Sequence, residues 1–203
     1  READGKVSHA VTNPISTTGG VVGLKGNLAP EGAIVKIAGM ADEDIVFTGP
    51  ALIFECEQDA FEAVQNRTYS EGDVFVIRNE GPSGGPGMRE MLSPTSAIMG
   101  KGLGEDIALI TDGRFSGGSH GFVVGHVTPE AVEGGPIAII ETGDKISIDA
   151  ESNEVTLQLR DDEIASRLAK WEKPPARYTR GVLAKFAASV ASASEGAVTD
   201  KYL

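Results

Sequence analysis

The sequence has few basic residues and a single cysteine, and each shortage excludes a class of protein. Its 203 residues include 18 Lys and Arg against 30 Asp and Glu, a formal net charge of −12. No Lys/Arg cluster offsets this balance, so the chain lacks the basic face that a nucleic-acid backbone requires. Cys56 has no second cysteine for a disulfide, and it cannot alone hold a zinc ion or an iron–sulfur cluster. We expect it to be a buried small hydrophobe.

Long apolar runs and targeting signals are also missing. Every apolar run is far shorter than the ~18–20 residues of a membrane span, so we expect a soluble protein without membrane contact. The chain opens Arg-Glu-Ala-Asp-Gly, with no Met, apolar signal segment or Arg/Ser-rich transit pattern. We therefore expect a processed chain or a piece of a longer protein. The length suits one generous domain or two small ones.

Short β-branched runs bounded by Gly, Pro or Asp predict strands joined by tight turns. They lie at residues 21–24, 33–37, 45–47, 51–54, 73–78, 107–110, 122–127, 137–140, 145–149 and 154–159. Helices are predicted at 57–67, from 161 to the stop at Pro174-Pro175, and at 181–194 with Gly196 as its stop. Residues 1–20 form a polar lead-in. Nine or ten strands with few helices predict a β-rich α+β domain, closed or barrel-like, rather than a doubly wound sheet.

Glycine is the residue in excess: there are 26, and 12 of them lie between Gly81 and Gly125. The first glycine-rich block, residues 81–91, is not a phosphate loop, because it lacks the Gly-Lys-Ser/Thr ending and contains two prolines without amide donors. It presents one carboxylate, Glu90. Hard cations take carboxylate oxygens, so Glu90 is a candidate Mg²⁺ ligand. The alternative is a solvated glutamate that starts a helix through residues 97–99.

The second block, residues 111–121, directly follows a predicted buried strand, where loops place functional groups on a rigid base. Ser116 lies beside two glycines that leave its hydroxyl open to a ligand, but Arg114 breaks the Gly-x-Ser-x-Gly pattern of hydrolases. A serine that acts as a base needs a nearby cation or metal. Arg114 is the local candidate, and a structural pair with Asp112 is its alternative. His120 and His126 match no compact zinc spacing and are interpreted as structural.

Taken together, four stretches resemble one family. Residues 26–33, 84–91, 111–118 and 125–131 occur in family order, and the sequence is similar to the C-terminal domain of dihydroxy-acid and sugar-acid dehydratases. The resemblance covers nearly the whole chain. The second and third stretches resemble the branched-chain dihydroxy-acid branch more than the sugar-acid branch. One departure is Ser83, which stands where many members have lysine.

This resemblance implies a single C-terminal domain over residues 1–203, with the barrel-like swivelling β/β/α fold and peripheral helices of aconitase-type enzymes. It implies a larger N-terminal domain, outside this chain, that holds an iron–sulfur cluster ([2Fe–2S] or [4Fe–4S]) and most of the Mg²⁺ ligands. Glu90 matches the Mg²⁺-ligating glutamate of this domain. Ser116 matches the serine proposed as proton acceptor.

The activity that the resemblance implies is loss of water from a 2,3-dihydroxy-3-methyl acid, giving a 2-oxo acid for valine and isoleucine biosynthesis. The implied partners are this substrate, the N-terminal domain and a second copy in a homodimer. The isolated domain is expected to be inactive. The expected compartment is the cytoplasm in a bacterium, or a plastid or mitochondrial matrix in a eukaryote. The alternatives are a sugar-acid (aldonate or phosphogluconate) dehydratase and a non-catalytic assembly or binding module with the same fold.

Overall fold

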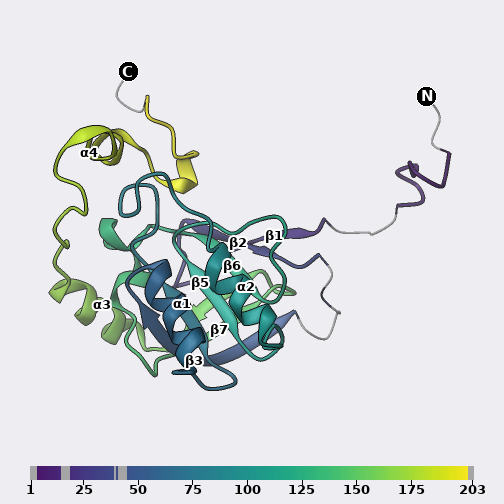
Figure 1. Cartoon of the computed structure of the whole chain (residues 1–203), viewed down its shortest axis with the longest axis horizontal. Helices are drawn as coiled ribbons and strands as arrows, with labels where there is room; N and C mark the ends of the chain where they lie inside the picture. Colours follow the sequence, from purple (N-terminus) through teal and green to yellow (C-terminus); the bar gives the residue numbers. More distant parts are fainter. Residues whose placement is uncertain (1–3, 15–18, 39, 41–44, 201–203) are drawn as a thin grey trace.

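A mixed sheet of eight strands closes almost into a barrel (Figure 1). The computed structural model describes residues 4–14, 19–38, 40 and 45–200. The strands are β1 (Val21–Leu24), β2 (Gly32–Lys36), β3 (Val46–Phe54), β4 (Val74–Ile77), β5 (Ala108–Thr111), β6 (Val123–Thr128), β7 (Lys145–Asp149) and β8 (Glu154–Leu157). Their spatial order is β1-β2-β6-β5-β4-β3-β7-β8. This arrangement confirms the predicted β-rich, barrel-like α+β class.

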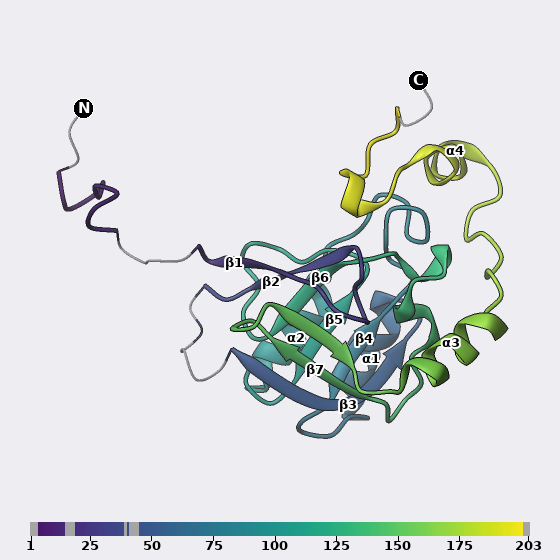
Figure 2. The ribbon, with the colours of Figure 1, turned by 180° about the vertical axis from the view of Figure 1, so that it is seen from behind.

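The helices are few and lie outside the barrel (Figures 1 and 2). They are α1 (Glu57–Asn66), α2 (Leu92–Gly100), α3 (Asp161–Lys170) and α4 (Gly181–Ser189), with 3₁₀ turns η2 (Ala131–Glu133), η3 (Pro136–Ile139) and η4 (Ala193–Glu195). Strands β3, β4, β5 and β6 run parallel, and every other pair in the sheet is antiparallel. Helices α1 and α2 connect the parallel strands and pack together outside them.

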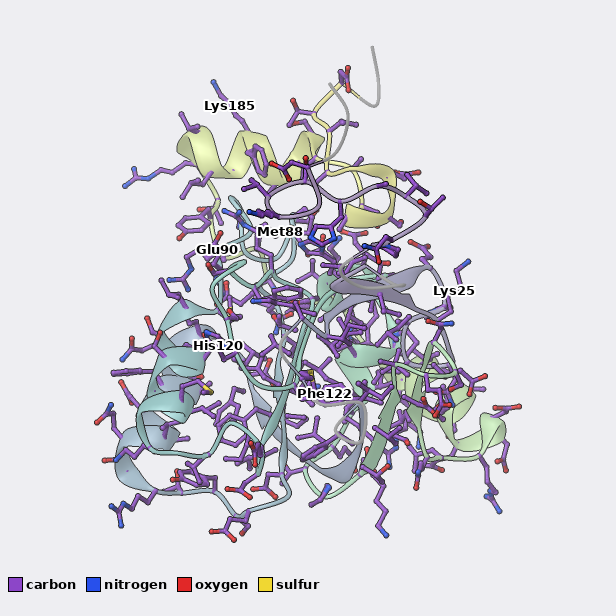
Figure 3. All side chains as sticks on the ribbon, turned by 90° about the vertical axis from the view of Figure 1, so that its right-hand side faces the viewer. Lys25, Met88, Glu90, His120, Phe122 and Lys185 are labelled. Carbon is purple, nitrogen blue, oxygen red and sulfur yellow. The ribbon has the colours of Figure 1, made fainter. Side chains whose placement is uncertain are left out.

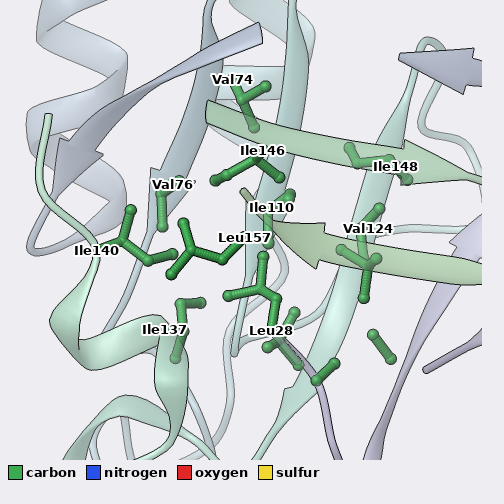
Figure 4. Packing of buried hydrophobic residues seen from close by; sticks show 14 of the residues in the cluster. Leu28, Val74, Val76, Ile110, Val124, Ile137, Ile140, Ile146, Ile148 and Leu157 are labelled. Atoms are coloured by element: carbon green, nitrogen blue, oxygen red, sulfur yellow. The ribbon is translucent and has the colours of Figure 1, made fainter. Parts of the chain in front are cut away.

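Two hydrophobic clusters lie on the two faces of the parallel strands, because successive side chains of a strand point to opposite faces. Val74, Val76 and Ile110 point into the barrel, where they meet residues of β7, β8 and η3 (Figure 4). Phe75 and Leu109 point outward against the residues of α1 and α2. Strands buried on both faces read as continuous apolar runs, which is why these runs show no alternation in the sequence.

Backbone hydrogen bonds of Lys25 and the side chain of Asn27 close the barrel between its two edge strands, β1 and β8. Asn27 follows β1, and its amide nitrogen donates to the carbonyl of Leu157 on β8 at 2.9 Å. The Leu157 backbone N–H donates in return to Asn27 Oδ1 at 2.8 Å. Lys25 and Glu154 form an isolated bridge beside this pair. The Asn27 side-chain amide therefore bonds both backbone groups of Leu157, as the backbone of a neighbouring strand would.

Three predicted elements are wrong. Residues 45–47 and 51–54 belong to one strand, β3, which pairs with β7 through its first half and with β4 from Ala51 onward. Two predicted strands are therefore one, and the run at residues 137–140 is not a strand. The described ranges contain eight strands instead of the predicted nine or ten. Residues 137–140 lie instead on the 3₁₀ turn η3 and its cap, because Pro136 suits the first position of a helical turn. Ile137 and Ile140, three residues apart, both enter the core.

The predicted helix at 181–194 ends early, at Ser189. Val190 is extended, and the N–H of the buried Ala191 donates to the carbonyl of Val198, which draws the chain back toward the barrel. A separate 3₁₀ turn, η4, ends at Gly196. No residue of α4 is buried, and Val182 is 80% exposed. At the other end of the chain, residues 4–14 of the lead-in are exposed and extend away from the barrel (Figures 1 and 2).

Candidate functional site

Acidic residues follow the four parallel strands where these strands end. Glu55 comes after β3, Glu80 after β4, Asp112 after β5 and Glu130 after β6. The carboxyl ends of parallel strands meet at one edge of a sheet, which is the edge where α/β sheets place their ligands. Three of these acids, Glu80, Asp112 and Glu130, are buried. Both glycine-rich blocks begin at this edge.

Asp112 joins three chain segments with one carboxylate. It accepts the backbone N–H groups of Asn79 at 3.1 Å, Glu80 at 2.9 Å and Ala131 at 2.9 Å. Burial raises its pKa to about 6. Because backbone amides occupy this carboxylate, Asp112 does not pair with Arg114 among the described contacts, and that alternative is wrong.

Glu130 holds the start of the first glycine-rich block in the same way. Its Oε1 accepts the N–H of Ser83 at 2.9 Å, and its Oε2 accepts the N–H of Gly84 at 2.8 Å. Burial raises the pKa of Glu130 to about 7. A β-carbon at Gly81 would lie 2.5 Å from Glu130 Oε2, so the glycine makes room for this carboxylate.

Glu80 is fully enclosed, and of the three buried acids it is the one that accepts from arginine side chains. Its Oε1 accepts from the Glu57 N–H and from Arg89 Nη2, each at 3.1 Å. Its Oε2 accepts from Arg177 Nη1 at 3.2 Å, which brings the C-terminal part of the chain to the site. Arg89 directly precedes Glu90, so Glu80 positions the backbone that carries the candidate metal ligand.

Glu90 lies before α2 and not on it, since the helix begins at Leu92. Its backbone forms an isolated bridge with Arg114, and the Met91 N–H donates to the Arg114 carbonyl at 2.8 Å. Arg114 Nη1 lies 3.3 Å from Glu90 Oε1, while Arg114 Nε donates to the Met88 carbonyl at 2.6 Å. The two glycine-rich blocks therefore run side by side here. Met88 and Glu90 lie below α4 in Figure 3.

Ser116, two residues after Arg114, is half-buried in a tight turn. Its hydroxyl accepts the N–H of Gly118 at 3.2 Å, and its carbonyl accepts the N–H of Ser119 at 3.0 Å. Gly117 and Gly118 are both exposed, and a β-carbon at Gly118 would contact Ser116 Oγ. Neither glycine places a side chain over this hydroxyl.

In the part of the chain that the structure describes, His120, His126 and Cys56 belong to no group of three His, Cys, Asp or Glu that could hold a metal ion. His120 is exposed, and the half-buried His126 stacks on Phe115 with ring centroids 6.3 Å apart. Burial lowers the pKa of His126, which favours the neutral ring. Cys56 is partly exposed at the N-terminal cap of α1, so its predicted burial is wrong; partial burial still raises its pKa.

Comparison with known proteins identifies the family. A family model described as dihydroxy-acid/6-phosphogluconate dehydratase C-terminal matches residues 6–197. The chain belongs to this family. Dihydroxy-acid dehydratase of Dinoroseobacter shibae is 64% identical over 98% of the chain, and that of Methylococcus capsulatus is 63% identical over 94%. In both cases the chain spans 34% of the relative's length.

For the metal that the resemblance implies, the described residues offer one candidate ligand, Glu90. Glu90 has the ligand chemistry for Mg²⁺, because its carboxylate side chain is 38% exposed at the molecular surface. Among the described residues, its ion-pair partner is Arg114, at 3.3 Å. The described residues contain no group of three His, Cys, Asp or Glu that could hold a metal ion. Cys56 alone does not fit an iron–sulfur cluster, which needs several ligands.

A cavity of about 460 Å³ opens beside the first glycine-rich block. It is lined by Ser83, by the segment from Lys173 to Tyr178 and by Ala184, Ala187 and Ala188 of α4. Ser83 Oγ donates to the Ala187 carbonyl at 3.4 Å, so this hydrogen bond connects the block to α4.

None of the helices in the described ranges is long and apolar enough to cross a membrane.

Sequence reasoning missed several residues that organise the site. These residues are Glu80, Glu130 and Lys36. Each forms hydrogen bonds with a loop whose residues are distant in the sequence. One feature of the sequence could have indicated the two acids: each comes shortly after a predicted strand. Lys36 had no such feature, because its contacts lie more than eighty residues away along the chain.

Proposed function

We propose that this chain is the C-terminal part of a dihydroxy-acid dehydratase that removes water from 2,3-dihydroxy-3-methyl acids. The products are 2-oxo acids that serve the biosynthesis of valine and isoleucine. The observation that carries the proposal is the juxtaposition of two blocks: the one with Glu90 and the one with Ser116 run side by side through Arg114. Relatives that are 63–64% identical are dihydroxy-acid dehydratases by name, which supports the same reaction.

Ser116 is the proposed base. Its alkoxide takes the proton from C2 of the substrate, and the C3–O bond breaks as the departing hydroxyl takes a proton from solvent and leaves as water. Ser116 then returns the C2 proton to solvent, so the overall change is loss of one water. The enol that remains tautomerises to the 2-oxo acid. The N–H of Gly118 already points at Ser116 Oγ and stabilises negative charge there. The open glycines 117 and 118 let a substrate approach this oxygen.

Glu90 is the proposed Mg²⁺ ligand of this chain. When bound, Mg²⁺ stabilises the negative charge that develops on the substrate oxygens as the C2 proton leaves. Arg114, which belongs to the same glycine-rich block as Ser116, pairs with the Glu90 carboxylate. Because Glu90 is one carboxylate, the remaining ligands belong to the longer protein, as do all ligands of the iron–sulfur cluster. A homodimer of that protein remains part of the proposal.

The test is Ser116→Ala in the full-length protein that contains this chain, assayed on 2,3-dihydroxyisovalerate. We expect turnover to be abolished while the iron–sulfur absorbance stays as in the wild type. Near-normal turnover in the variant removes Ser116 from the mechanism. A wild-type protein that binds the cluster and turns over no dihydroxy acid supports the non-catalytic module instead.

A second candidate is a sugar-acid dehydratase of the same family, because the matching family description also names 6-phosphogluconate dehydratase. Both enzymes would use Ser116 and Glu90 in the same way. Parallel assays of the wild type on 2,3-dihydroxyisovalerate and on aldonates separate them, since a sugar-acid dehydratase prefers the longer substrate.

A further inference from the structure

The Ser116 loop has a cation that the sequence does not reveal, and it is not Arg114. A serine hydroxyl that must lose its proton needs positive charge nearby. Arg114 is the nearest cation in sequence, but its guanidinium is engaged with Glu90 and the Met88 carbonyl. The positive charge next to the loop comes from another strand, β2.

Lys36 is the last residue of β2. Val35 pairs with Val124, so Lys36 lies beside the start of β6, where the loop that carries Ser116 ends. Its ammonium donates to the carbonyl of Gly117 at 2.5 Å and to the carbonyl of Ser119 at 2.7 Å. Among the described residues no carboxylate lies within ion-pair distance of Lys36. Its charge is therefore directed at this loop.

One peptide group links Lys36 to the serine. The carbonyl of Gly117 and the N–H of Gly118 belong to the same planar trans peptide, and they point in opposite directions. Lys36 holds the carbonyl end, and the N–H end donates to Ser116 Oγ at 3.2 Å. A cation on the carbonyl both fixes the plane of this peptide and polarises its N–H, since linked hydrogen bonds strengthen one another.

We propose that Lys36 is a positioning residue that orients and polarises the Gly117–Gly118 peptide, so that its N–H stabilises the Ser116 oxygen once the hydroxyl loses its proton. The inference rests on the proposed role of Ser116 as a base. It is independent of which dihydroxy acid is the substrate. Lys36 itself does not contact the substrate in this role; it acts through the peptide.

The experiment compares Lys36→Met, Lys36→Arg and Ser116→Ala in the full-length enzyme, with Lys25→Met as control. Lys25 is exposed near the end of the neighbouring strand β1, and Figure 3 shows it far from Glu90. We expect kcat of Lys36→Met to fall about 10- to 100-fold, below the ~100- to 1,000-fold loss typical of removing a direct oxyanion donor. KM should change little, and Lys36→Arg should recover most of the rate.

The pH profile distinguishes positioning from mere stabilisation of the fold. Without Lys36 the serine is harder to deprotonate, so the loss in kcat should be largest near neutral pH and shrink as the pH rises. The other charged or titratable side chains on or against this loop, Asp112, Arg114, His120, His126 and Glu90, are unchanged in every variant. If Lys36→Met does not fold, Lys36→Gln, which keeps a donor without the charge, makes the same comparison.

Two results overturn the proposal. One is a kcat of Lys36→Met within twofold of the wild type, and the other is a loss that is the same at every pH and is not recovered by Lys36→Arg. If Ser116→Ala retains turnover, the proposed role of Ser116 fails as well. If Ser116→Ala is inactive while Lys36→Met behaves as wild type, only the role of Lys36 fails.

Discussion

Gly85 and Gly113 both lie against the enclosed side chain of Glu80. A β-carbon at Gly85 would be 2.7 Å from Glu80 Cα, and one at Gly113 would be 3.1 Å from Glu80 Cβ. Neither glycine has a positive φ, so both are required for space and not for backbone conformation. The excess of glycine between residues 81 and 125 is thus partly a packing requirement around buried acids. Gly81 meets the same requirement beside Glu130.

Gly85→Ala tests this explanation at the scale of one residue. The new methyl group overlaps backbone atoms of Glu80, which cannot move as a flexible side chain can. We expect the free energy of unfolding to fall by about 1–3 kcal/mol, the usual cost of overpacking, measured by urea denaturation of the 203-residue chain. Gly100→Ala is the control, because no heavy atom lies within 4 Å of its added β-carbon. A Gly85→Ala variant as stable as wild type contradicts the packing argument.

At the scale of elements, the site depends on connections between strands and not on any single strand or helix. The carboxylates of Asp112 and Glu130 accept only backbone N–H groups, from segments that follow β4 and β6. These bonds set where the two glycine-rich blocks begin. Lys36 then fixes the far end of the Ser116 loop from β2. The loops are irregular, yet fixed groups on the barrel hold them at both ends.

Closure of the barrel is the element-scale feature most open to measurement. Asn27→Ala removes both hydrogen bonds to the Leu157 backbone and leaves a half-buried N–H and C=O without these partners. We expect a loss of about 1–3 kcal/mol in the free energy of unfolding, the cost of leaving such groups unsatisfied. Asn66→Ala, at the exposed end of α1, should change it by less than ~0.5 kcal/mol. Equal stability of the two variants would show that β1 and β8 associate without Asn27.

At the scale of the whole molecule, the described residues bury a core of their own, whereas they offer only one candidate metal ligand, Glu90. The strands, α1, α2 and η3 bury two continuous hydrophobic clusters. The chain nevertheless spans 34% of the length of its similar relatives, and its one cysteine is not a cluster site. The proposed Glu90 and Ser116 both lie on irregular loops at the surface. We therefore expect the proposed catalytic site to form only together with the rest of a longer protein.

This leads to a prediction for the 203-residue chain alone. After anaerobic reconstitution with iron and sulfide and addition of Mg²⁺, it should show neither iron–sulfur absorbance nor turnover of 2,3-dihydroxyisovalerate. The full-length protein, treated in the same way, is the control and should show both. Cluster absorbance or turnover in the short chain would place the missing ligands within residues 1–203.

The sequence by itself determined the class of fold and most of its elements. Short β-branched runs bounded by turn residues gave seven of the eight strands with little error, because strand propensity and burial agree at those positions. It also singled out Glu90 and Ser116, whose loops the structure brings together; their chemical roles stay predictions. The helix at residues 181–194 was overextended because its apolar pattern continues past Ser189, where a contact between Ala191 and Val198 ends it.

Only the tertiary structure decided which charged groups meet. Arg114 pairs with Glu90 and not with Asp112, because Asp112 lies at the strand edge, where three backbone amides converge on it. Lys36 reaches a loop eighty residues away because β2 and β6 are neighbours in the barrel. Local sequence encodes propensity and periodicity. Which distant groups become partners depends on strand order, and that follows from how the whole chain buries its core.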